Sequence, residues 1–457
     1  MAPHAANGRA GDRSIGSAVP RDGVAFYNVS MNAPPKAAPI DVLLIGGGVA
    51  GLWALDALTS RGLSCLLAER DELGRGQTVA SQGIVHGGLK YTLTGLLTGS
   101  ARNIREMPGL WRRCVEGNPD LLFPQEGEAG GSHPNLSETP VRAPHCYLWR
   151  SESLTGRLGM IGAKAGLRVA PTALPAAEIP PVLRSVKGPV CRLDEQVLSP
   201  AGFVANLRNR NLDRLLRVAN DGLAFDADGG QVRTVTLTAP DGCTLTVAPR
   251  HVALTAGAGN AGLLSALGLP AGPNVPAMQR RPLHMVLVRG PAVGEHRLAA
   301  LSGHCVDGAK TRVTITSDTD SSGHVVWQVG GQLAEEGVKL DPPALIEKAQ
   351  RELSEAIPGL DLSHCEWATY RVDRAEGDAG GMRPEDAQIY TAGNVHTCWP
   401  TKLALAPVLA ARLAERVGRG ERTAFLPPAD WPRPAVAAPP WETCEWRTLH
   451  APLRRAA

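Results

Sequence analysis

One stretch of the sequence, from Asp41 to Arg70, holds a strand, a glycine turn, a helix and a second strand in close succession. Asp41–Ile45 is an apolar run typical of a buried parallel strand. The run from Gly46 to Gly51 then opens a helix, and Leu63–Ala68 supplies the second strand. Together they form one βαβ unit. The chain is therefore predicted to be an α/β protein built on a parallel sheet.

Each glycine of this turn has a physical role in a dinucleotide site. Gly46 permits the tight turn, Gly48 lets a pyrophosphate approach the backbone, and Gly51 lets helix and strand pack closely. The helix N-terminus adds N–H groups and a positive dipole. Glu69, followed by Arg70, stands about 20 residues beyond Gly46, where an acid holds the ribose hydroxyls. The segment predicts a site for FAD or NAD, and its carboxylate argues against a 2′-phosphate.

The composition is that of a soluble globular protein. Hydrophobic residues make up 43% of the 457 residues and charged residues 20%, which is enough for two domains or one large composite. The net charge of +3 forms no basic stripe, so nucleic acid is not an expected partner. Nine scattered cysteines without a CxxC pair indicate reduced thiols in the cytoplasm and no metal. Neither a membrane span nor a signal peptide is expected.

The two ends of the chain differ from its middle. Residues 1–39 are rich in Ala, Gly, Pro and Arg and are predicted to be a disordered leader. Met31 stands ten residues before the first strand, and one hypothesis is that it is the true start, which the intact mass of the native protein would test. Residues 425–457 are rich in Pro and Trp, and we expect them to lie extended over the surface with tryptophans as anchors: Trp431, Trp441 and Trp446.

A glycine-flexible loop over residues 82–91 brings a histidine, a lysine and a tyrosine together. Its residues are Gln82, Gly83, Ile84, Val85, His86, Gly87, Gly88, Leu89, Lys90 and Tyr91. Paired glycines remove the side chains that would block a flat ring system, so this loop could pass close to one. An ordinary glycine turn with a core-facing histidine is the alternative interpretation.

The remaining pattern predicts further strands and helices. Ser199 and Pro200 begin a helix through residues 203–217, and Asp241-Gly242 joins a hairpin of 231–238 and 243–247. An apolar strand at 251–255 runs into a turn at Gly257 and belongs beside the first strand. The other expected elements are an antiparallel sheet of 283–288, 312–316 and 325–329, a helix over 341–358, a last strand at 389–391, and a helix to about 417.

In this order, the pieces resemble the D-amino-acid oxidase-like family of FAD-dependent oxidoreductases, over roughly residues 40–417. Four matches carry the resemblance: the glycine turn with Glu69, the loop Ser81–Tyr91, the turn Thr255–Gly259, and the segment from Gly393 through Thr401 to Pro407. The loop is most similar to those of glycerol-3-phosphate dehydrogenases and L-2-hydroxyglutarate dehydrogenases, although Ala80-Ser81-Gln82 departs from their usual approach to it. The resemblance implies FAD rather than NAD.

The resemblance also implies an architecture: a Rossmann-like FAD-binding domain with a discontinuous α+β substrate domain that carries an antiparallel sheet. The FAD-binding domain would comprise residues 40–109, 190–272 and 365–424, and the substrate domain 110–189 and 273–364. The active site would lie between them.

Site residues follow from the same resemblance. Arg371 is the first choice for binding the substrate anion, because a guanidinium can form two parallel hydrogen bonds to it, and Arg374 is the second choice. The alternative for Arg371 is an ion pair with Asp373 or Glu376. His86 is expected to be the base or a flavin contact, with Lys90 and Tyr91 beside the substrate. The residues expected to bind the cofactor are Gly46, Gly48, Gly51, Glu69, Arg70, Ser81, Gly87, Gly88, Gly257, Gly393, Thr401, Lys402 and Leu403, and no metal is expected.

The implied activity is transfer of a hydride from a small anionic substrate, a 2-hydroxy acid or glycerol 3-phosphate, to flavin N5. An amine or amino-acid oxidase on the same scaffold, or a non-catalytic flavin-binding interaction protein, are the alternatives. An electron acceptor is needed, whether oxygen, a quinone or a redox protein. For a quinone the enzyme would be peripheral to the membrane, which the basic end from Arg447 to Arg455 favours. Covalent and noncovalent flavin both remain open.

Overall fold

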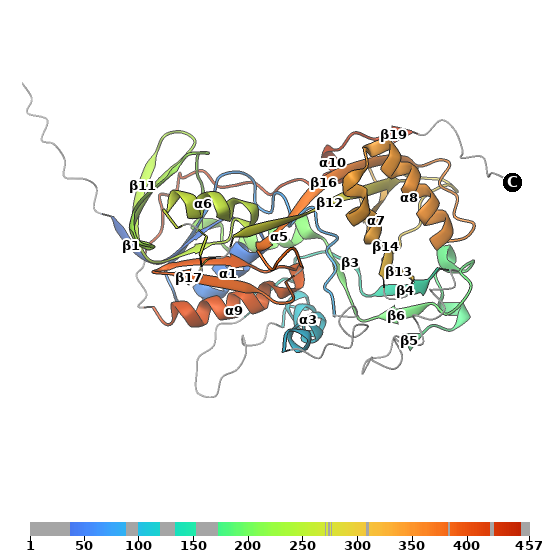
Figure 1. Cartoon of the computed structure of the whole chain (residues 1–457), viewed down its shortest axis with the longest axis horizontal. Coiled ribbons are helices and arrows are strands. Elements are labelled where there is room, and N and C mark those ends of the chain that lie inside the picture. The colour runs from blue at the N-terminus through green and yellow to red at the C-terminus, as the bar shows by residue number, and fades with distance from the viewer. Residues whose placement is uncertain are drawn as a thin grey trace, which may run out of the picture. The chain divides into compact units, whose positions relative to one another are not determined.

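The computed structural model describes residues 37–87, 99–118, 133–151, 172–269, 271–272, 275, 277–307, 310–382, 384–420 and 425–448, with the side chains of 99–103 outside that description. The predicted disorder before residue 37 and the proposed start at Met31 therefore lie outside the described residues. From Ala37 onward, two large sheets carry the fold (Figure 1).

The first sheet has eight strands and a parallel centre. Its order is β17-β18-β11-β1-β2-β8, with β10 paired to β11 and β9 to β10. The five strands from β18 to β8 are parallel, as expected of a sheet begun by a βαβ unit. The bounds are β1 (Ala38–Ile45), β2 (Cys65–Glu69), β8 (Leu215–Arg217), β9 (Leu223–Asp228), β10 (Gln231–Thr238), β11 (Thr244–Leu254), β17 (Gln388–Ala392) and β18 (Val395–Trp399).

Both faces of this sheet are buried, which is why β1 is apolar at every position from Val42 to Ile45. Val42 and Leu44 pack into one core cluster, and Leu43 and Ile45 into another on the opposite face. Figure 1 shows α1 and α9 side by side near this sheet. The helices are α1 (Val49–Ser60), α3 (Gly99–Val115), α5 (Pro200–Arg210), α6 (Asn260–Ala266) and α9 (Ala406–Val417), with the 3₁₀ turns η3 (Leu212–Arg214), η4 (Gly257–Gly259) and η6 (Leu403–Leu405).

The second sheet has nine strands in the order β19-β16-β12-β15-β14-β13-β4-β6-β5. Its pairs are antiparallel except β13 with β4. The helices α7 and α8 pack against β12, β14 and the neighbouring strands (Figure 1).

These strands are β4 (Cys146–Arg150), β5 (Thr172–Ala173), β6 (Cys191–Leu193), β12 (Met278–Arg289), β13 (Gly303–Asp307), β14 (Lys310–Thr319), β15 (Val325–Gly330), β16 (Glu366–Gly377) and β19 (Arg447–Thr448). The remaining elements are a two-stranded pair, β3 (Val141–Ala143) and β7 (Val197–Leu198), the helices α7 (Gln332–Glu336), α8 (Pro342–Ala356) and α10 (Pro440–Thr443), and the turns η1 (Ala176–Glu178), η2 (Pro181–Leu183) and η5 (Gly337–Lys339).

Three sequence predictions are corrected by the strand pairing. The helix expected through residue 217 ends at Arg210, because Leu215 and Leu216 are buried in β8 and pair with β2. The segments 243–247 and 251–255 belong to one long strand, β11. The boundary expected at residue 365 also shifts, since β16 pairs along its whole length with β12 of the second sheet.

The described part of the tail is held by its tryptophans, as predicted for two of the three. Trp431 and Trp441 are buried, and the Trp431 indole N–H donates to the Arg217 carbonyl at 2.9 Å. Trp446 is half-buried, and the Arg289 guanidinium lies 4.3 Å from its ring centroid.

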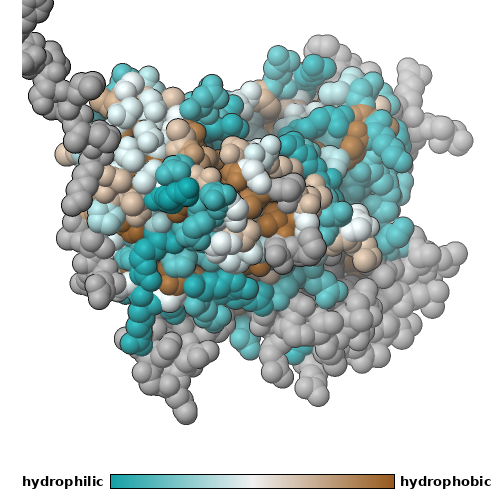
Figure 2. All heavy atoms as spheres, turned by 60° about the vertical axis from the view of Figure 1, so that its left-hand side comes forward, coloured by the Kyte–Doolittle hydropathy of each residue, from teal (hydrophilic) through white to brown (hydrophobic). Residues whose placement is uncertain are grey.

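One face of the described residues, shown in Figure 2, carries both hydrophilic and hydrophobic residues. Figure 2 shows apolar atoms gathered in small patches between hydrophilic ones on the face in view. Among the helices of the described residues, none combines the length and the apolar character that crossing a bilayer requires.

Candidate active site

The glycine turn after β1 has the geometry that its sequence predicts. Gly46 has φ +110°, and a Cβ there would lie 2.4 Å from the Ala256 Cα. A Cβ at Gly51 would lie 2.0 Å from the Gly46 carbonyl oxygen, so close helix–strand packing requires glycine. At Gly48, a Cβ would meet only the Thr78 hydroxyl within 4 Å, at 3.3 Å. The turn is therefore tightly packed at Gly46 and Gly51 and open at Gly48.

Glu69 ends β2 beside this turn. Its Oε2 accepts the Gly47 N–H at 2.6 Å, and its Oε1 accepts the Asp71 N–H at 3.0 Å. These bonds hold the carboxylate at the end of the parallel strand, where an open α/β sheet binds ligands.

A cavity of about 550 Å³ extends over the turn, which is a size suited to a cofactor. Most of the predicted cofactor residues line it: Gly46, Gly48, Glu69, Arg70, Ser81, Gly257, Thr401, Lys402 and Leu403. Arg371, Asp373, Cys398 and Trp399 line it as well. A Cβ at Gly257 would meet no atom within 4 Å, so the wall is open there too. The residues present fit a dinucleotide.

Gly393 is not among the residues that line this cavity. It lies in the turn between β17 and β18 with φ +60°, and a Cβ there would be 2.3 Å from the Gly230 carbonyl oxygen. A close backbone contact therefore explains this glycine, at the end of β18 away from Trp399. Gly87 lies beside the second cavity described below, where its N–H donates to Glu195. Gly88, Lys90 and Tyr91 lie outside the described residues.

Thr401 has the one positive φ, +60°, recorded for a non-glycine residue among the described residues. The Lys402 N–H donates to the Pro400 carbonyl at 2.7 Å, which closes a γ-turn centred on Thr401. The Thr401 hydroxyl donates to the Asp386 carbonyl at 3.2 Å. Strained turns of this kind cluster at ligand sites, and this one leads into η6 and α9.

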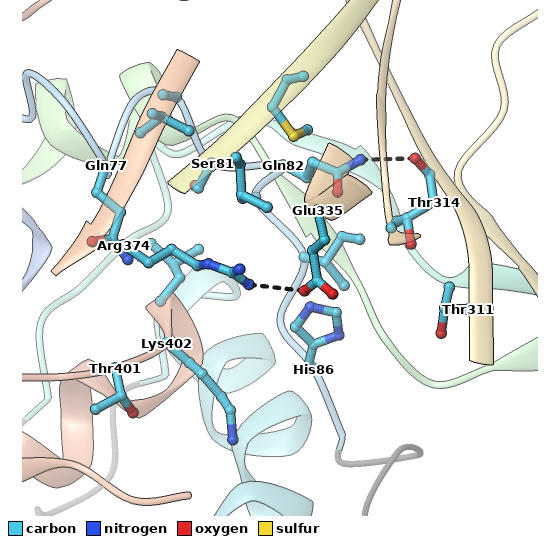
Figure 3. Close-up of a pocket in the computed structure, with 18 of the residues that line it drawn as sticks. Gln77, Ser81, Gln82, His86, Thr311, Thr314, Glu335, Arg374, Thr401 and Lys402 are labelled. Atoms are coloured by element: carbon cyan, nitrogen blue, oxygen red, sulfur yellow. Dashed lines mark hydrogen bonds and ion pairs between the residues drawn. The ribbon is translucent and has the colours of Figure 1, made fainter. Parts of the chain in front are cut away.

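A second cavity of about 500 Å³ adjoins the first. The two share six lining residues: Gln77, Ser81, Val372, Thr401, Lys402 and Leu403. The second cavity continues toward the strands of the nine-stranded sheet, where Leu283, Met285 and Thr314 line it (Figure 3). A molecule in this cavity would therefore lie directly beside one in the first.

The floor of the second cavity is joined to the nine-stranded sheet by amide and hydroxyl groups. The Gln82 side-chain N–H donates to the carbonyls of Thr314 at 3.1 Å and Gln328 at 2.9 Å. The Tyr370 hydroxyl donates to the Ala80 carbonyl at 2.8 Å. Burial raises the pKa of Tyr370 well above its usual range, so the phenol stays protonated and keeps donating.

Basic groups line this second cavity, and Arg374 is prominent among them. Arg374 lies 3.3 Å from a carboxylate oxygen of Glu335, which lines the cavity too (Figure 3). Lys402 is buried, and its ammonium donates to the Glu385 carbonyl at 3.2 Å. The cavity can therefore attract an anion while offering one carboxylate of its own.

Arg371, the first choice from the sequence, lies elsewhere. Its guanidinium donates to the Val338 carbonyl at 3.0 Å and to the Leu340 carbonyl at 2.9 Å. The carboxylates considered as its partners pair with other arginines, Asp373 with Arg280 and Glu376 with Arg281. It borders the cofactor cavity and is absent from the lining of the second cavity.

His86, predicted to be the base or a flavin contact, lines the second cavity. Its Nδ1 lies 3.7 Å from the buried carboxylate of Glu195, which also lies 3.3 Å from the His304 Nε2. Burial opposes ionisation of Glu195, but the hydrogen bonds and charges of His304 and His86 outweigh it and hold the carboxyl pKa well below its usual range. Neither Glu195 nor His304 was predicted from the sequence.

Two clusters of described residues bring potential metal ligands together. One is His86, Glu195 and His304, and the other is the exposed group His296, Asp361 and His364. In each, the ligand atoms lie within 4.8 Å of one another. Neither cluster was anticipated from sequence spacing, because each is assembled from separated segments.

Comparison with known proteins connects this geometry to a family. The family model described as FAD dependent oxidoreductase matches residues 41–415. The "Probable FAD-dependent oxidoreductase PA4991" of Pseudomonas aeruginosa is 37% identical over 425 residues, which cover 89% of this chain and 99% of that protein. Its crystal structure matches with a TM-score of 0.71 at 34% identity, over 90% of this chain and 99% of that one.

Two further similarities are more distant or shorter. L-alpha-glycerophosphate oxidase from Mycoplasma pneumoniae, solved with FAD bound, has a TM-score of 0.57 at 14% identity, over 86% of this chain and 97% of its own. Glycerol-3-phosphate dehydrogenase of Pseudomonas tolaasii is 42% identical over 62 residues, which cover 14% of this chain and 12% of that protein.

Proposed function

The chain belongs to the D-amino-acid oxidase-like family of FAD-dependent oxidoreductases, and on this premise we propose that it oxidises a small anionic substrate, a 2-hydroxy acid or glycerol 3-phosphate. FAD, when bound, supplies the oxidising power by accepting a hydride at N5. The protein then has to hold the cofactor, bind the substrate anion and remove a proton.

For the cofactor, we assign the residues that line the first cavity. Glu69 would bind the ribose hydroxyls, and the open face of the turn at Gly48 would lie against the pyrophosphate. The backbone of Thr401 to Leu403, at the start of η6 and α9, would provide N–H groups and a positive helix end near the flavin.

The observation that carries the proposed substrate class is the adjoining second cavity, with Arg374, Lys402 and His86 in its lining. Arg374 and Lys402 would neutralise a carboxylate or phosphate. The Arg374 Nε donates to the Arg281 carbonyl at 3.4 Å and its Nη1 to Glu335 at 3.3 Å, so the anion would bind mainly at Nη2. His86 would accept the proton of the hydroxyl that is oxidised. Because the cavity lies beside the cofactor cavity, a substrate held by these groups would present its C–H to the flavin.

Amine or amino-acid oxidation is the second candidate function, and Glu335 is the observation that favours it. This carboxylate lines the cavity 3.3 Å from Arg374, so an ammonium and a carboxylate of one substrate could each find an opposite charge. Glu335→Gln separates the two candidates. This variant should bind an anionic alcohol more tightly, because Arg374 is released from its ion pair. It should bind an amino acid more weakly, because the partner of the ammonium is removed.

The described cysteines support a cytoplasmic location, because none of the nine forms a disulfide. The reduced flavin must pass its electrons to an acceptor. The candidates are oxygen, a soluble quinone and a redox protein, and each can be added in turn to the reduced enzyme. Flotation with anionic vesicles, for the whole chain and a chain ended at residue 446, tests whether the basic end brings the enzyme to a membrane.

The deciding experiment is the visible spectrum of the purified protein under anaerobic conditions, before and after addition of glycerol 3-phosphate, 2-hydroxy acids and amino acids. Bleaching of the flavin by one of the anionic alcohols is the expected result. Bleaching by amino acids alone, with release of ammonia, would transfer the assignment to the second candidate. A flavin that every alcohol and amino acid leaves oxidised would contradict both.

A further inference from the structure

Three side chains from separate parts of the chain meet in the lining of the second cavity. His86 follows the isolated bridge at Ile84, Glu195 lies in the connection between β6 and β7, and His304 lies on β13. Glu195 is at the centre of this group and, at 4% exposure, is nearly inaccessible to water. A carboxylate buried to this extent needs partners for its charge.

Both oxygens of Glu195 have such partners. Its Oε1 accepts the Gly87 N–H at 2.8 Å, and its Oε2 lies 3.3 Å from the His304 Nε2 and 3.7 Å from the His86 Nδ1. An ionised carboxylate only accepts hydrogen bonds, so the His304 Nε2 that faces it carries a hydrogen. The His86 Nδ1, at 3.7 Å, is beyond the usual hydrogen-bond distance, but the negative charge favours a hydrogen on this nitrogen of the ring. The basic nitrogen of a neutral His86 is then Nε2, while Nδ1 of His304 lies 3.0 Å from the Thr314 hydroxyl.

The backbone holds His86 and Glu195 in register. The bridge between Ile84 and Val197 is antiparallel. Around it, the Val85 N–H donates to the Gln196 carbonyl and the Leu198 N–H to the Gly83 carbonyl, each at 2.9 Å. Consequently the distance between imidazole and carboxylate depends on paired backbone rather than on a long side chain reaching across open space.

We propose that Glu195 is a positioning residue that selects the tautomer of His86 and stabilises its protonated form, and that His304 and Gly87 hold Glu195 in place. This inference rests on the proposed function, in which His86 removes the substrate proton. In each turnover the hydroxyl proton passes to Nε2 of His86. Bound FAD would supply the oxidising power by taking the C–H hydrogen with its electron pair, and the alcohol carbon would become a carbonyl. The imidazolium then has the buried carboxylate as its counter-charge.

Other charged groups contribute to the electrostatic environment of His86. Glu335, Arg374, Lys402 and Glu385 line the same cavity, and Arg374 is paired with Glu335. Behind Glu195, the Arg112 guanidinium of α3 pairs with Asp194. None of the variants below changes any of these groups.

The test is a titration of His86 by NMR in the FAD-loaded full chain with isotope-labelled histidine. Comparison with His86→Gln assigns the resonance, and no substrate is added. In Glu195→Gln, the pH midpoint of the His86 titration should fall by about one unit, the lower end of what an opposite charge at this distance produces. That shift is a tenfold weaker proton affinity. Glu195→Asp keeps the charge and should recover part of the shift.

Two further variants separate this role from general damage to the fold. His304→Gln keeps an N–H donor toward Glu195 but removes the second imidazole that shares its charge, so the midpoint should stay at or above the wild-type value. Glu376→Gln removes an equally buried carboxylate that pairs with Arg281 and is in the lining of neither cavity, so it should leave the midpoint unchanged. With a reducing substrate, the acidic limb of the pH profile for flavin reduction should follow the NMR midpoints.

An unchanged midpoint in folded, FAD-loaded Glu195→Gln would overturn the proposal. So would one equivalent of divalent metal, found by elemental analysis and lost in that variant, because the three side chains would then be metal ligands. The titration needs no substrate, so it can fail while the substrate assignment succeeds. It can equally succeed if every anionic alcohol leaves the flavin oxidised.

Discussion

Replacing Arg374 by glutamine should weaken anionic substrates selectively. The glutamine is shorter and uncharged, so the second cavity loses a guanidinium while Lys402 stays in place. Before a substrate binds, Arg374 lies 3.3 Å from a Glu335 oxygen and its side chain is 16% exposed. A substrate carboxylate or phosphate would therefore meet a positive charge that is only weakly screened by water but partly neutralised by a neighbour.

The magnitude follows from these two facts. A hydrogen bond to a charged group contributes about 1.5–3 kcal/mol, and each ~1.4 kcal/mol corresponds to a factor of ten. Without Glu335 the loss in kcat/KM would span about 10- to 150-fold by these figures. Because Glu335 already offsets part of the charge, we expect the lower part of that range, about 10- to 30-fold.

The assay is anaerobic flavin reduction followed by stopped flow, with an anionic substrate and its uncharged counterpart, for example glycerol 3-phosphate and glycerol. Arg371→Gln is the matched control, since it removes the same group from the other face of β16. Its guanidinium bonds to the Val338 and Leu340 carbonyls, so the substrate effect should stay below about threefold. Equal losses for charged and uncharged substrates in Arg374→Gln, or a larger loss in Arg371→Gln, would refute the reasoning.

Three further predictions concern the cofactor turn, the pH dependence of stability and the tail. Gly51→Ala places a Cβ 2.0 Å from the Gly46 carbonyl oxygen, so flavin content should fall sharply and stability by about 1–3 kcal/mol, while Gly262→Ala, with no atom within 4 Å, should change neither. Burial, together with His251, lowers the pKa of His396 to about 4, so the folded state stays neutral while the unfolded chain takes up a proton below its ordinary value of 6.5. Stability should accordingly decrease as the pH falls from about 6.5 to 4, by up to ~3 kcal/mol, and urea unfolding of His396→Gln should show a flatter dependence. Trp431→Ala should cost about 3–5 kcal/mol in thermal or urea unfolding, whereas Trp431→Phe should lose only about 1 kcal/mol for its bond to the Arg217 carbonyl.

The parts of the fold that were predictable are those set by local sequence. The unit from β1 to β2 is specified by an apolar run, a glycine spacing and a helix length, all within one short segment. Helices were predicted to begin at Ser199 and Asp341, and these residues cap α5 and α8 by accepting backbone N–H groups three residues further on. By contrast, Leu215–Arg217 reads as a continuation of α5. It becomes a strand only because β2 offers a free edge to pair with.

The missed site residues share a different property, which is their distance along the chain from the group they contact. Glu195 lies 108 residues from Gly87 and 109 from His304. In the sequence, Glu195 is one acid in a polar connection, and His304 is one histidine in a strand. Neither has a spacing pattern, because the contact joins the segment after β6 to β13, two parts of the nine-stranded sheet that lie far apart in the sequence. The sequence showed a motif only for the loop that contains His86, and this motif does not indicate which residue contacts the histidine.

The choice between Arg371 and Arg374 shows what a strand sequence leaves undetermined. Residues three apart on a strand face opposite sides, so only one of the two arginines can share a face with Val372. Pairing with β12 decides which side is the cavity: Val372 lies opposite Leu283, and both line it. Arg374 has the same parity as Val372 and enters the cavity. Arg371 lies opposite His284, and both donate to backbone carbonyls between α7 and α8. The sequence shows that Arg371 and Arg374 lie on opposite faces of the strand. Which face turns toward the cavity depends on pairing with a strand almost ninety residues away.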